Sequence, residues 1–262
     1  MKNLIRGLIV LSVIAGAVSL STQTPQEPPT AQAAAPTADE IVQKHLAAIG
    51  GKEAIGQVKS ISMESSAQIM GNDAPGTTLI VDGVGYRSEI DFNGQKIINT
   101  FNDKGGWMVN PMMGSSDPTP IPDDQYKLGK TQIFVGGPLF DYAAKGSKIE
   151  LVSKDDKTFK LKLTTKDNVD FVYTIDAETY LVKSQVSKGK MQDQDVDITT
   201  SFSDYRKTDT GYMLPYAMDI DFGGNFQLSI TVKKIELNKT IDPAVFEMPK
   251  PAAPAPAPSK PA

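Results

Sequence analysis

Residues 216–237 read YAMDIDFGGNFQLSITVKKIEL, and apolar and polar side chains alternate on both sides of Gly223-Gly224. A period of two is typical of strands that bury one face and expose the other. The alternation changes phase between Val232 and Ile235, which predicts a β-bulge near Lys233-Lys234. The stretch therefore predicts two one-face-buried strands of an antiparallel sheet.

The same alternation continues along most of the chain between Ser60 and Leu237. Its further rows are Ile61, Met63, Ser65, Ala67 and Ile69; Tyr86, Ser88, Ile90 and Phe92; Phe159, Leu161 and Leu163; Phe171, Tyr173 and Ile175; and Val196, Ile198 and Phe202. Asn93-Gly94 is a type I′ turn signal that predicts a hairpin. About ten to twelve sequential strands must close, curl or stack, so these patterns leave a sandwich and a strongly curved, barrel-like sheet open.

One amphipathic helix precedes the strands. Thr37 with Glu40 three residues later forms a capping-box pattern, and the apolar positions that follow have helical spacing until Gly50-Gly51. A second, short helical turn is expected over residues 54–58. The chain therefore begins its folded part with a helical cap.

A long segment that is rich in proline interrupts the strands. Residues 111–142 contain five prolines, which excludes a regular central strand, yet they also carry large apolar side chains. A long apolar loop must cover a core or gate a cavity. The pair Asp123-Asp124 follows Pro122 and is expected to start a helix there.

Composition sets the boundaries of the folded part. Lys2 and Arg6 precede a short apolar stretch, which is typical of a cleavable secretory signal and predicts a periplasmic location. The chain contains no cysteine, which excludes a lipidated cysteine and a disulfide framework. The predicted organisation is a signal peptide over 1–21, a disordered linker over 22–36, one domain over 37–248, and a disordered Pro/Ala tail over 249–262.

The residues that catalysis usually needs are scarce. The sequence has one histidine, His45, and no G-x-S-x-G, H-E-x-x-H or P-loop motif. His45 lies within the predicted helix and is expected to pack or face solvent rather than bind metal. The net charge of −4 argues against nucleic acid as a partner. We therefore expect a protein that is not an enzyme and has no cofactor or metal.

Several segments together resemble a known superfamily. They are residues 38–61 (ADEIVQKHLAAIGGKEAIGQVKSI), residues 106–111 (GWMVNP), and the ending from Ser203-Asp204-Tyr205 through Gly211, with Leu214-Pro215 and Ile235 to Pro249. In this pattern the chain is similar to the LolA/LolB-like superfamily of lipoprotein carriers, and most of all to outer-membrane lipoprotein-sorting proteins. The matching motifs are structural rather than catalytic, and they extend over nearly the whole predicted domain.

The resemblance implies a mainly β fold: an open antiparallel half-barrel of about 11 strands, with an N-terminal helix and short helices or a loop covering its concave face. It also implies a monomer with a hydrophobic cavity for lipid or lipoprotein acyl chains. Such carriers receive their cargo from an inner-membrane transporter and pass it to an outer-membrane acceptor. In the family an arginine latches the lid, but neither Arg87 nor Arg206 matches it by motif.

The residues expected to line the cavity or its lid come from two sources. The alternating strand rows supply an apolar wall, and methionines adapt to ligands of irregular shape. The expected residues are Met63, Ile90, Phe92, Trp107, Met112, Met113, Phe134, Leu139, Phe171, Tyr173, Met218, Ile220, Phe226, Leu228 and Ile230. Core packing is the alternative role for the methionines, and for Trp107 it is the favoured one. Three classes stay open: a lipid carrier, a sensor or scaffold of the same fold that binds a protein partner, and a plain sandwich or hydrolase.

Overall fold

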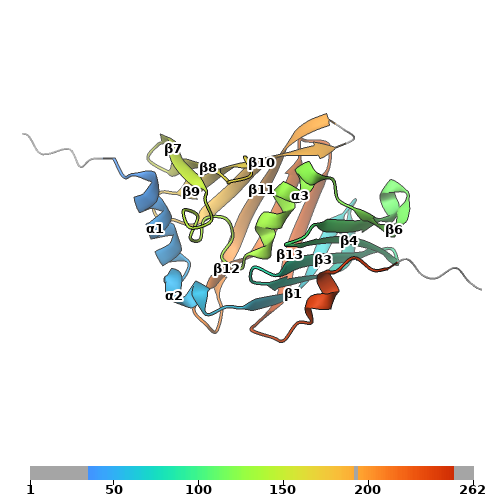
Figure 1. Ribbon diagram of the computed structural model, residues 1–262. Helices are drawn as coiled ribbons and strands as arrows, with labels where there is room; N and C mark the ends of the chain where they lie inside the picture. Colours follow the sequence, from blue (N-terminus) through green and yellow to red (C-terminus); the bar gives the residue numbers. More distant parts are fainter. Residues whose placement is uncertain (1–34, 192–193, 251–262) are drawn as a thin grey trace, which may run out of the picture. The chain divides into compact units, whose positions relative to one another are not determined.

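The computed structural model describes residues 35–191 and 194–250, and the residues from Pro36 onward form one compact unit. The predicted signal peptide, nearly all of the linker and most of the Pro/Ala tail lie outside the described residues. The unit is built on one antiparallel sheet of 13 strands in the order β6-β5-β4-β3-β2-β1-β13-β12-β11-β10-β9-β8-β7 (Figure 1). The sheet is not closed, so the predicted open, mainly β fold is confirmed.

The first six strands form a meander from the middle of the sheet to one edge. They are β1 (Ser60–Ile69), β2 (Asn72–Val81), β3 (Gly85–Phe92), β4 (Gln95–Asn102), β5 (Gly106–Asn110) and β6 (Ser115–Pro120). Asn93 and Gly94 both have positive φ at the turn between β3 and β4, as a type I′ turn requires. The hairpin predicted there is confirmed.

The other seven strands return from the opposite edge to the middle. They are β7 (Lys148–Lys154), β8 (Thr158–Thr164), β9 (Asp170–Asp176), β10 (Val182–Met191), β11 (Gln194–Lys207), β12 (Met213–Phe222) and β13 (Gln227–Leu237). Strand β13 then pairs with β1, which joins the two meanders into one sheet. Glu64 lies opposite Lys234 and Ser65 opposite Val232, so Lys233 is an extra residue and the predicted bulge is confirmed.

One part of the proline-rich segment was expected to be irregular and is not. Residues Ser115–Pro120 form β6, which pairs with β5 alone at the edge of the sheet. A proline has no N–H to donate. An edge strand has a neighbour on one side only, so a residue whose nitrogen points to the free side does not need to donate a hydrogen bond. This edge position explains how Pro118 and Pro120 fit a strand.

Within residues 35–191 and 194–250, three helices and three short 3₁₀ turns accompany the sheet. They are α1 (Ala38–Ala48), α2 (Gly51–Gly56), α3 (Asp123–Gly129), η1 (Pro111–Met113), η2 (Lys130–Ile133) and η3 (Pro243–Phe246). Thr37 caps α1 and forms the predicted capping box with Glu40. Gly50 has φ +117° between α1 and α2, and a Cβ there would lie 2.5 Å from the carbonyl oxygen of Gly211. No helix among the described residues is long and apolar enough to span a membrane.

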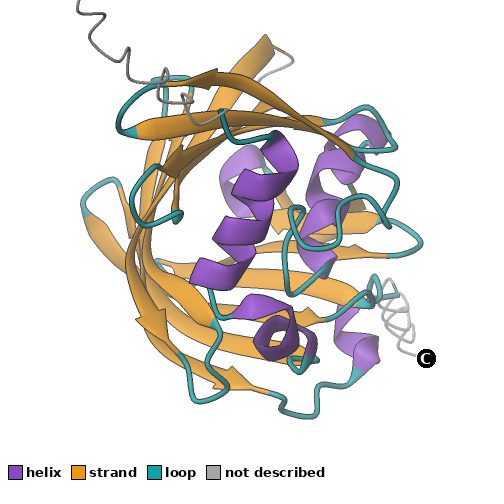
Figure 2. Ribbon diagram, turned by 90° about the vertical axis from the view of Figure 1, so that its left-hand side faces the viewer, coloured by secondary structure: helices purple, strands orange, loops and turns teal. Residues whose placement is uncertain are grey.

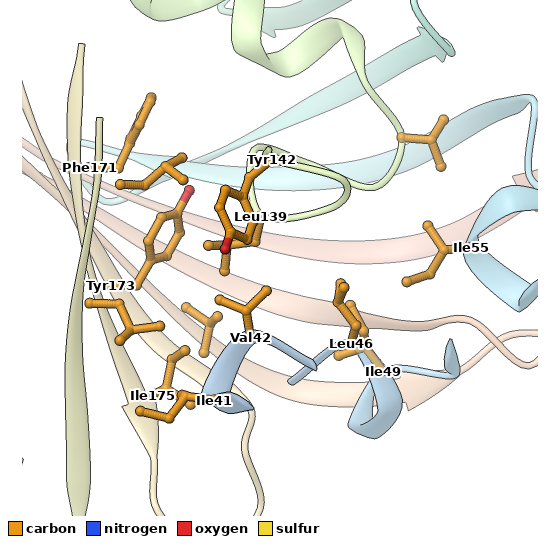
Figure 3. Close-up of a cluster of buried hydrophobic side chains, with 14 of the residues drawn as sticks. Ile41, Val42, Leu46, Ile49, Ile55, Leu139, Tyr142, Phe171, Tyr173 and Ile175 are labelled. Carbon is orange, nitrogen blue, oxygen red and sulfur yellow. The ribbon is translucent and has the colours of Figure 1, made fainter. Parts of the chain in front are cut away.

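The main core lies between the helices and the inner face of the curved sheet. Figure 2 shows the sheet bending around α1, α2 and α3, and we call this inner face the concave face. Helix α1 buries Ile41, Val42 and Leu46 against side chains of β8 and β9 such as Leu161 and Ile175 (Figure 3). Each such side chain contributes about 1.5–3 kcal/mol on burial, so α1 closes one end of the concave face firmly.

Candidate functional site

A cavity of about 430 Å³ lies on the concave face, within the size range of roughly 300–1,000 Å³ that is usual for ligand sites. We call it the main cavity. Its floor is made by β12 and β13, its walls by β1–β3 and β10–β11, and its cover by α3 and η2. The apolar side chains that line it are Met63, Ile90, Leu128, Phe171, Ile198, Phe202, Met218, Ile220, Phe222, Ile230 and Val232.

The apolar lining continues beyond the main cavity toward the far end of the same strands. Phe92, Phe226 and Leu228 pack there with Ile90 and Ile230, around a small buried set that consists of Ala67, Ile69 and Ala74. The rings of Phe222 and Phe226 are 5.8 Å apart, which links this end to the main cavity. We call it the apolar basin. Among the described residues it contains none from a helix, and its larger side chains are half-buried.

A second cavity of about 290 Å³ adjoins the main cavity on the side of α1. We call it the inner cavity. It is ringed by four tyrosines, which are Tyr86, Tyr173, Tyr205 and Tyr212. Some side chains line both cavities, namely Tyr86, Thr131, Gln132, Gln185 and Phe202. The two spaces are therefore neighbours that share one wall.

Residues 130–147, which we call the covering segment, lie over these cavities and are attached to the sheet by polar contacts. The amide of Gly83 donates to the carbonyl of Ile133 at 2.9 Å. The amide of Val135 donates to Asp82 at 3.0 Å, and its carbonyl accepts from the Tyr212 hydroxyl at 3.1 Å. The expected covering loop is therefore held by hydrogen bonds to the β2–β3 turn and to a residue just before β12.

Lys145 fastens the covering segment to itself. Its ammonium donates to the carbonyls of Gly137 at 3.0 Å and Phe140 at 2.7 Å. The same ammonium lies 4.4 Å from the centre of the Phe134 ring. Burial lowers the pKa of Lys145, and the nearby carboxylates of Asp82 and Asp141 act in the opposite direction. These contacts of Lys145 thus stabilise one conformation of the covering segment.

The cavity walls carry little charge at neutral pH. Burial raises the pKa of Tyr173, Tyr205 and Tyr212, which keeps their hydroxyls protonated. Burial also lowers the pKa of His45, whose Nδ1 lies 2.9 Å from the carbonyl oxygen of Tyr180. His45 is 6% exposed, so it packs inside the protein as the sequence suggested.

Glu89 is the one charged residue among the described residues that line the main cavity. Burial alone would raise its pKa, but hydrogen bonds from Lys96 and Arg87 outweigh burial and lower it. Its carboxylate lies 2.8 Å from Arg87 and 2.6 Å from Lys96. The charge is therefore compensated within the protein and is not left for a ligand.

The structure brings most of the predicted site residues together. Met63, Ile90, Phe171, Met218, Ile220 and Ile230 line the main cavity. Phe134, Leu139 and Tyr173 line the inner cavity. Phe92, Phe226 and Leu228 lie in the apolar basin. Most of these side chains share one face because successive residues of a strand point to opposite sides of the sheet.

Two predicted residues are not part of this arrangement, and the side chain of a third, Met113, lies outside the described residues. Met112 is 47% exposed in η1. Trp107 is the cross-strand partner of Thr100, and Thr100 is the partner of Arg87, so the three side chains share one face of the sheet. Tyr86 precedes Arg87 on β3, points to the other face, and lines the cavities. Trp107 therefore lies on the face away from the cavities, where its indole donates to the carbonyl of Phe246. Packing is its role, and no cavity rim is involved.

Several polar residues of the site were not predicted. They are Thr78, Thr131, Gln132, Gln185, Ser187 and Thr200. A signal for such residues was present, because Ser65 and Ser88 interrupt two of the apolar rows at positions that face the cavity. Polar residues at inward positions of a strand row thus mark the polar part of the lining.

Comparison with solved structures identifies the fold. A LolA superfamily protein from Nitrosomonas europaea matches with a TM-score of 0.52 and 12% identity, over 81% of this chain and 98% of that one. A DUF1329 family protein from Desulfovibrio piger matches with a TM-score of 0.51 and 16% identity, over 80% and 97%. A putative outer-membrane lipoprotein-sorting domain from Vibrio parahaemolyticus has a TM-score of 0.47 and 17% identity, over 79% and 94%.

The sequence itself gives no such match. No family model matches it, and no curated protein matches it either. The likeness to the Nitrosomonas and Desulfovibrio structures confirms the predicted LolA-like resemblance at the level of the fold. A shared fold leaves the function to be argued from the site.

Proposed function

We propose that this protein is a periplasmic carrier, without enzymatic activity, that binds lipid or the acyl chains of lipoproteins in the main cavity for transport toward the outer membrane. The observation that carries the proposal is the continuous apolar lining from the main cavity into the apolar basin. A core filled by its own side chains would leave no such space. The LolA-like fold of the unit agrees with this role.

Burial of acyl chains is the source of the binding free energy. Each methylene that leaves water contributes about 0.8 kcal/mol, so ten buried methylenes would supply roughly 8 kcal/mol before the cost of ordering the chain. The lining is flexible as well as apolar, because Met63 and Met218 lie in the main cavity. Methionine adapts to ligands of different shape, which suits a carrier that must accept and release cargo.

The route of transport follows from the predicted export signal and from the superfamily resemblance. A secreted carrier would receive its cargo from an inner-membrane transporter and deliver it to an outer-membrane acceptor. It would act as a monomer, without cofactor or nucleic acid.

Native mass spectrometry tests the proposal with two matched variants of one strand. Ile230 lines the main cavity, whereas the exposed Thr231 faces the opposite side of β13. The protein is exported to the periplasm, purified without detergent, and weighed with any bound lipid. We expect bound acyl species in the wild type and in Thr231→Trp, and their loss in Ile230→Trp. A wild-type mass without ligand, and no uptake of a fluorescent diacylglycerol, would contradict the carrier.

A sensor or scaffold of the same fold is the second candidate. The observation in its favour is that the sheet ends in two edge strands, β6 and β7, of which β7 exposes Val152 to 56%. An edge strand can pair with a strand of another protein. This candidate predicts a ligand-free mass together with a partner that is lost when Val152 is replaced by proline.

A further inference from the structure

The main cavity has hydrogen-bonding side chains on two facing walls. In one wall, Thr78 of β2 is the cross-strand partner of Ser88 of β3. In the other wall, Gln185 of β10 is the partner of Thr200 of β11. The apolar floor of β12 and β13 lies between these walls in the order of the strands. The cavity therefore offers both a polar region and an apolar region to one ligand.

One buried polar atom beside the second wall has no partner in the protein. Among the described residues, the buried hydroxyl of Tyr173 makes no hydrogen bond, and the half-buried Gln185 and Thr200 line the main cavity next to it. Tyr173 is 3% exposed, lines the inner cavity, and is the cross-strand partner of Gln185. A buried polar group without a partner is rare in folded proteins and calls for an explanation. A group on a ligand would supply the missing partner.

A charged ligand does not suit these walls. No lysine or arginine is found among the described residues that line the main and inner cavities, and the single carboxylate, Glu89, is paired with Arg87 and Lys96. A buried phosphate or carboxylate needs cationic partners, because it loses its hydration on entry. Hydroxyl and amide groups instead match the carbonyl oxygens of esters and amides, which are uncharged acceptors.

Two lysines of an adjoining cavity are already engaged. A third cavity, of about 400 Å³, lies on the outer side of the covering segment and is lined by Lys130 and Lys145 among others. Lys130 forms an ion pair with Asp167 at 2.6 Å, and Lys145 donates to two backbone carbonyls. Neither ammonium is therefore free to neutralise a headgroup that lies in the main cavity.

We infer that the cargo is an uncharged acyl lipid whose ester or amide linkage lies where the main and inner cavities adjoin, against Gln185, Thr200 and Tyr173. Its chains then extend over Ile220 and Phe222 into the apolar basin. The inference rests on the proposed carrier function and narrows it to one class of ligand. A neutral glycerolipid and the acylated cysteine of a lipoprotein share this chemistry, whereas an anionic phospholipid does not.

Titration of the full chain with three soluble probes tests the inference. Dioctanoylglycerol and dioctanoyl phosphatidic acid have the same chains and differ in charge, and a short triacylated cysteine peptide represents the lipoprotein source. We expect dioctanoylglycerol to bind at least tenfold more tightly than the phosphatidic acid. The peptide binds more tightly still if lipoproteins are the natural source, and more weakly if glycerolipids are. Equal or tighter binding of phosphatidic acid overturns the inference while leaving a lipid carrier in place. No binding of any probe removes the carrier function and the inference together.

Variants at the second wall give an independent readout. Thr200→Val and Gln185→Leu remove polar atoms with little change in volume, and should each reduce the preference for the neutral probe severalfold. Gln185→Lys adds a cation and should reverse the preference toward phosphatidic acid. Thr199→Val is the control, since Thr199 precedes Thr200 on β11 and faces the opposite side of the sheet. If the three variants at Thr200 and Gln185 keep the wild-type preference as the control does, the polar wall does not contact the ligand and the inference is wrong.

Discussion

The indole Nε1 of Trp107 donates a hydrogen bond to the backbone carbonyl of Phe246 at 3.1 Å, on the face of the sheet opposite the cavities. The side-chain amide of Asn102 donates to the same carbonyl, also at 3.1 Å. The Phe246 ring is 1% exposed and lies over Gly85, where a Cβ would come within 2.3 Å of it. The end of the folded chain is thus fixed to β3, β4 and β5 without any contribution from the cavity side.

Loss of the Phe246 ring should destabilise the protein and leave lipid binding intact. A buried Phe→Ala substitution costs about 3–5 kcal/mol, so Phe246→Ala should lower the free energy of unfolding by that amount in urea titration. Met248→Ala is the control, because Met248 is 41% exposed and such surface changes cost about 0.5 kcal/mol or less. A loss of lipid binding by the folded fraction of Phe246→Ala would contradict the separation of the two faces.

His45 should make stability depend on pH in a window where carboxylates do not titrate. Burial lowers its pKa from the usual value of 6.5, so the unfolded chain binds a proton that the folded protein does not. Stability is then complete above about pH 6.5 and falls as the pH drops toward the lower folded pKa. We expect urea midpoints to decrease between about pH 7.5 and pH 5.5 in the wild type, and to be nearly constant in His45→Gln. An equal decrease in both proteins would assign the effect to other groups.

Lys145 should control how quickly cargo leaves the cavities. Hydrogen bonds from a charged donor are each worth about 1.5–3 kcal/mol, and Lys145 makes two of them within the covering segment. Lys145→Met should therefore speed release of a fluorescent diacylglycerol by roughly tenfold, which corresponds to about 1.4 kcal/mol. Stopped-flow dilution measures this rate. The control is Lys166→Met, an exposed lysine of the same outer cavity. Equal release rates in both variants would show that Lys145 does not hold the segment closed.

The strand pattern predicted the concave face well because alternation is a local property of the sequence. It placed Met218, Ile220 and Ile230 on one face, and these side chains do line the same cavity. Even the bulge at Lys233 followed from a change of phase. Contacts between distant segments were not accessible in this way. Trp107 meets Phe246 from 139 positions away, and nothing in the residues around Trp107 indicates that partner.

The number of strands and the polar wall of the cavity were harder to predict from the sequence, because both depend on the arrangement of the whole sheet. Strand β6 contains two prolines and forms only because it lies at an edge, which is a property of the whole sheet. Gln185 and Thr200 are common surface residues, and their importance depends on which side of β10 and β11 faces inward. That orientation is fixed by pairing with β9 and β12, whose own rows are apolar.

The position of a bound acyl chain tests the central claim most directly. A diacylglycerol with a photoreactive diazirine in one chain can be bound to the full-length protein, activated by light, and mapped by mass spectrometry of the peptides. Insertion into β12 and β13 at Ile220, Phe222, Leu228 or Ile230 is the result that a carrier with this cavity predicts. Insertion confined to exposed side chains such as Met70 and Val152, or no insertion that unlabelled diacylglycerol can compete away, would contradict it.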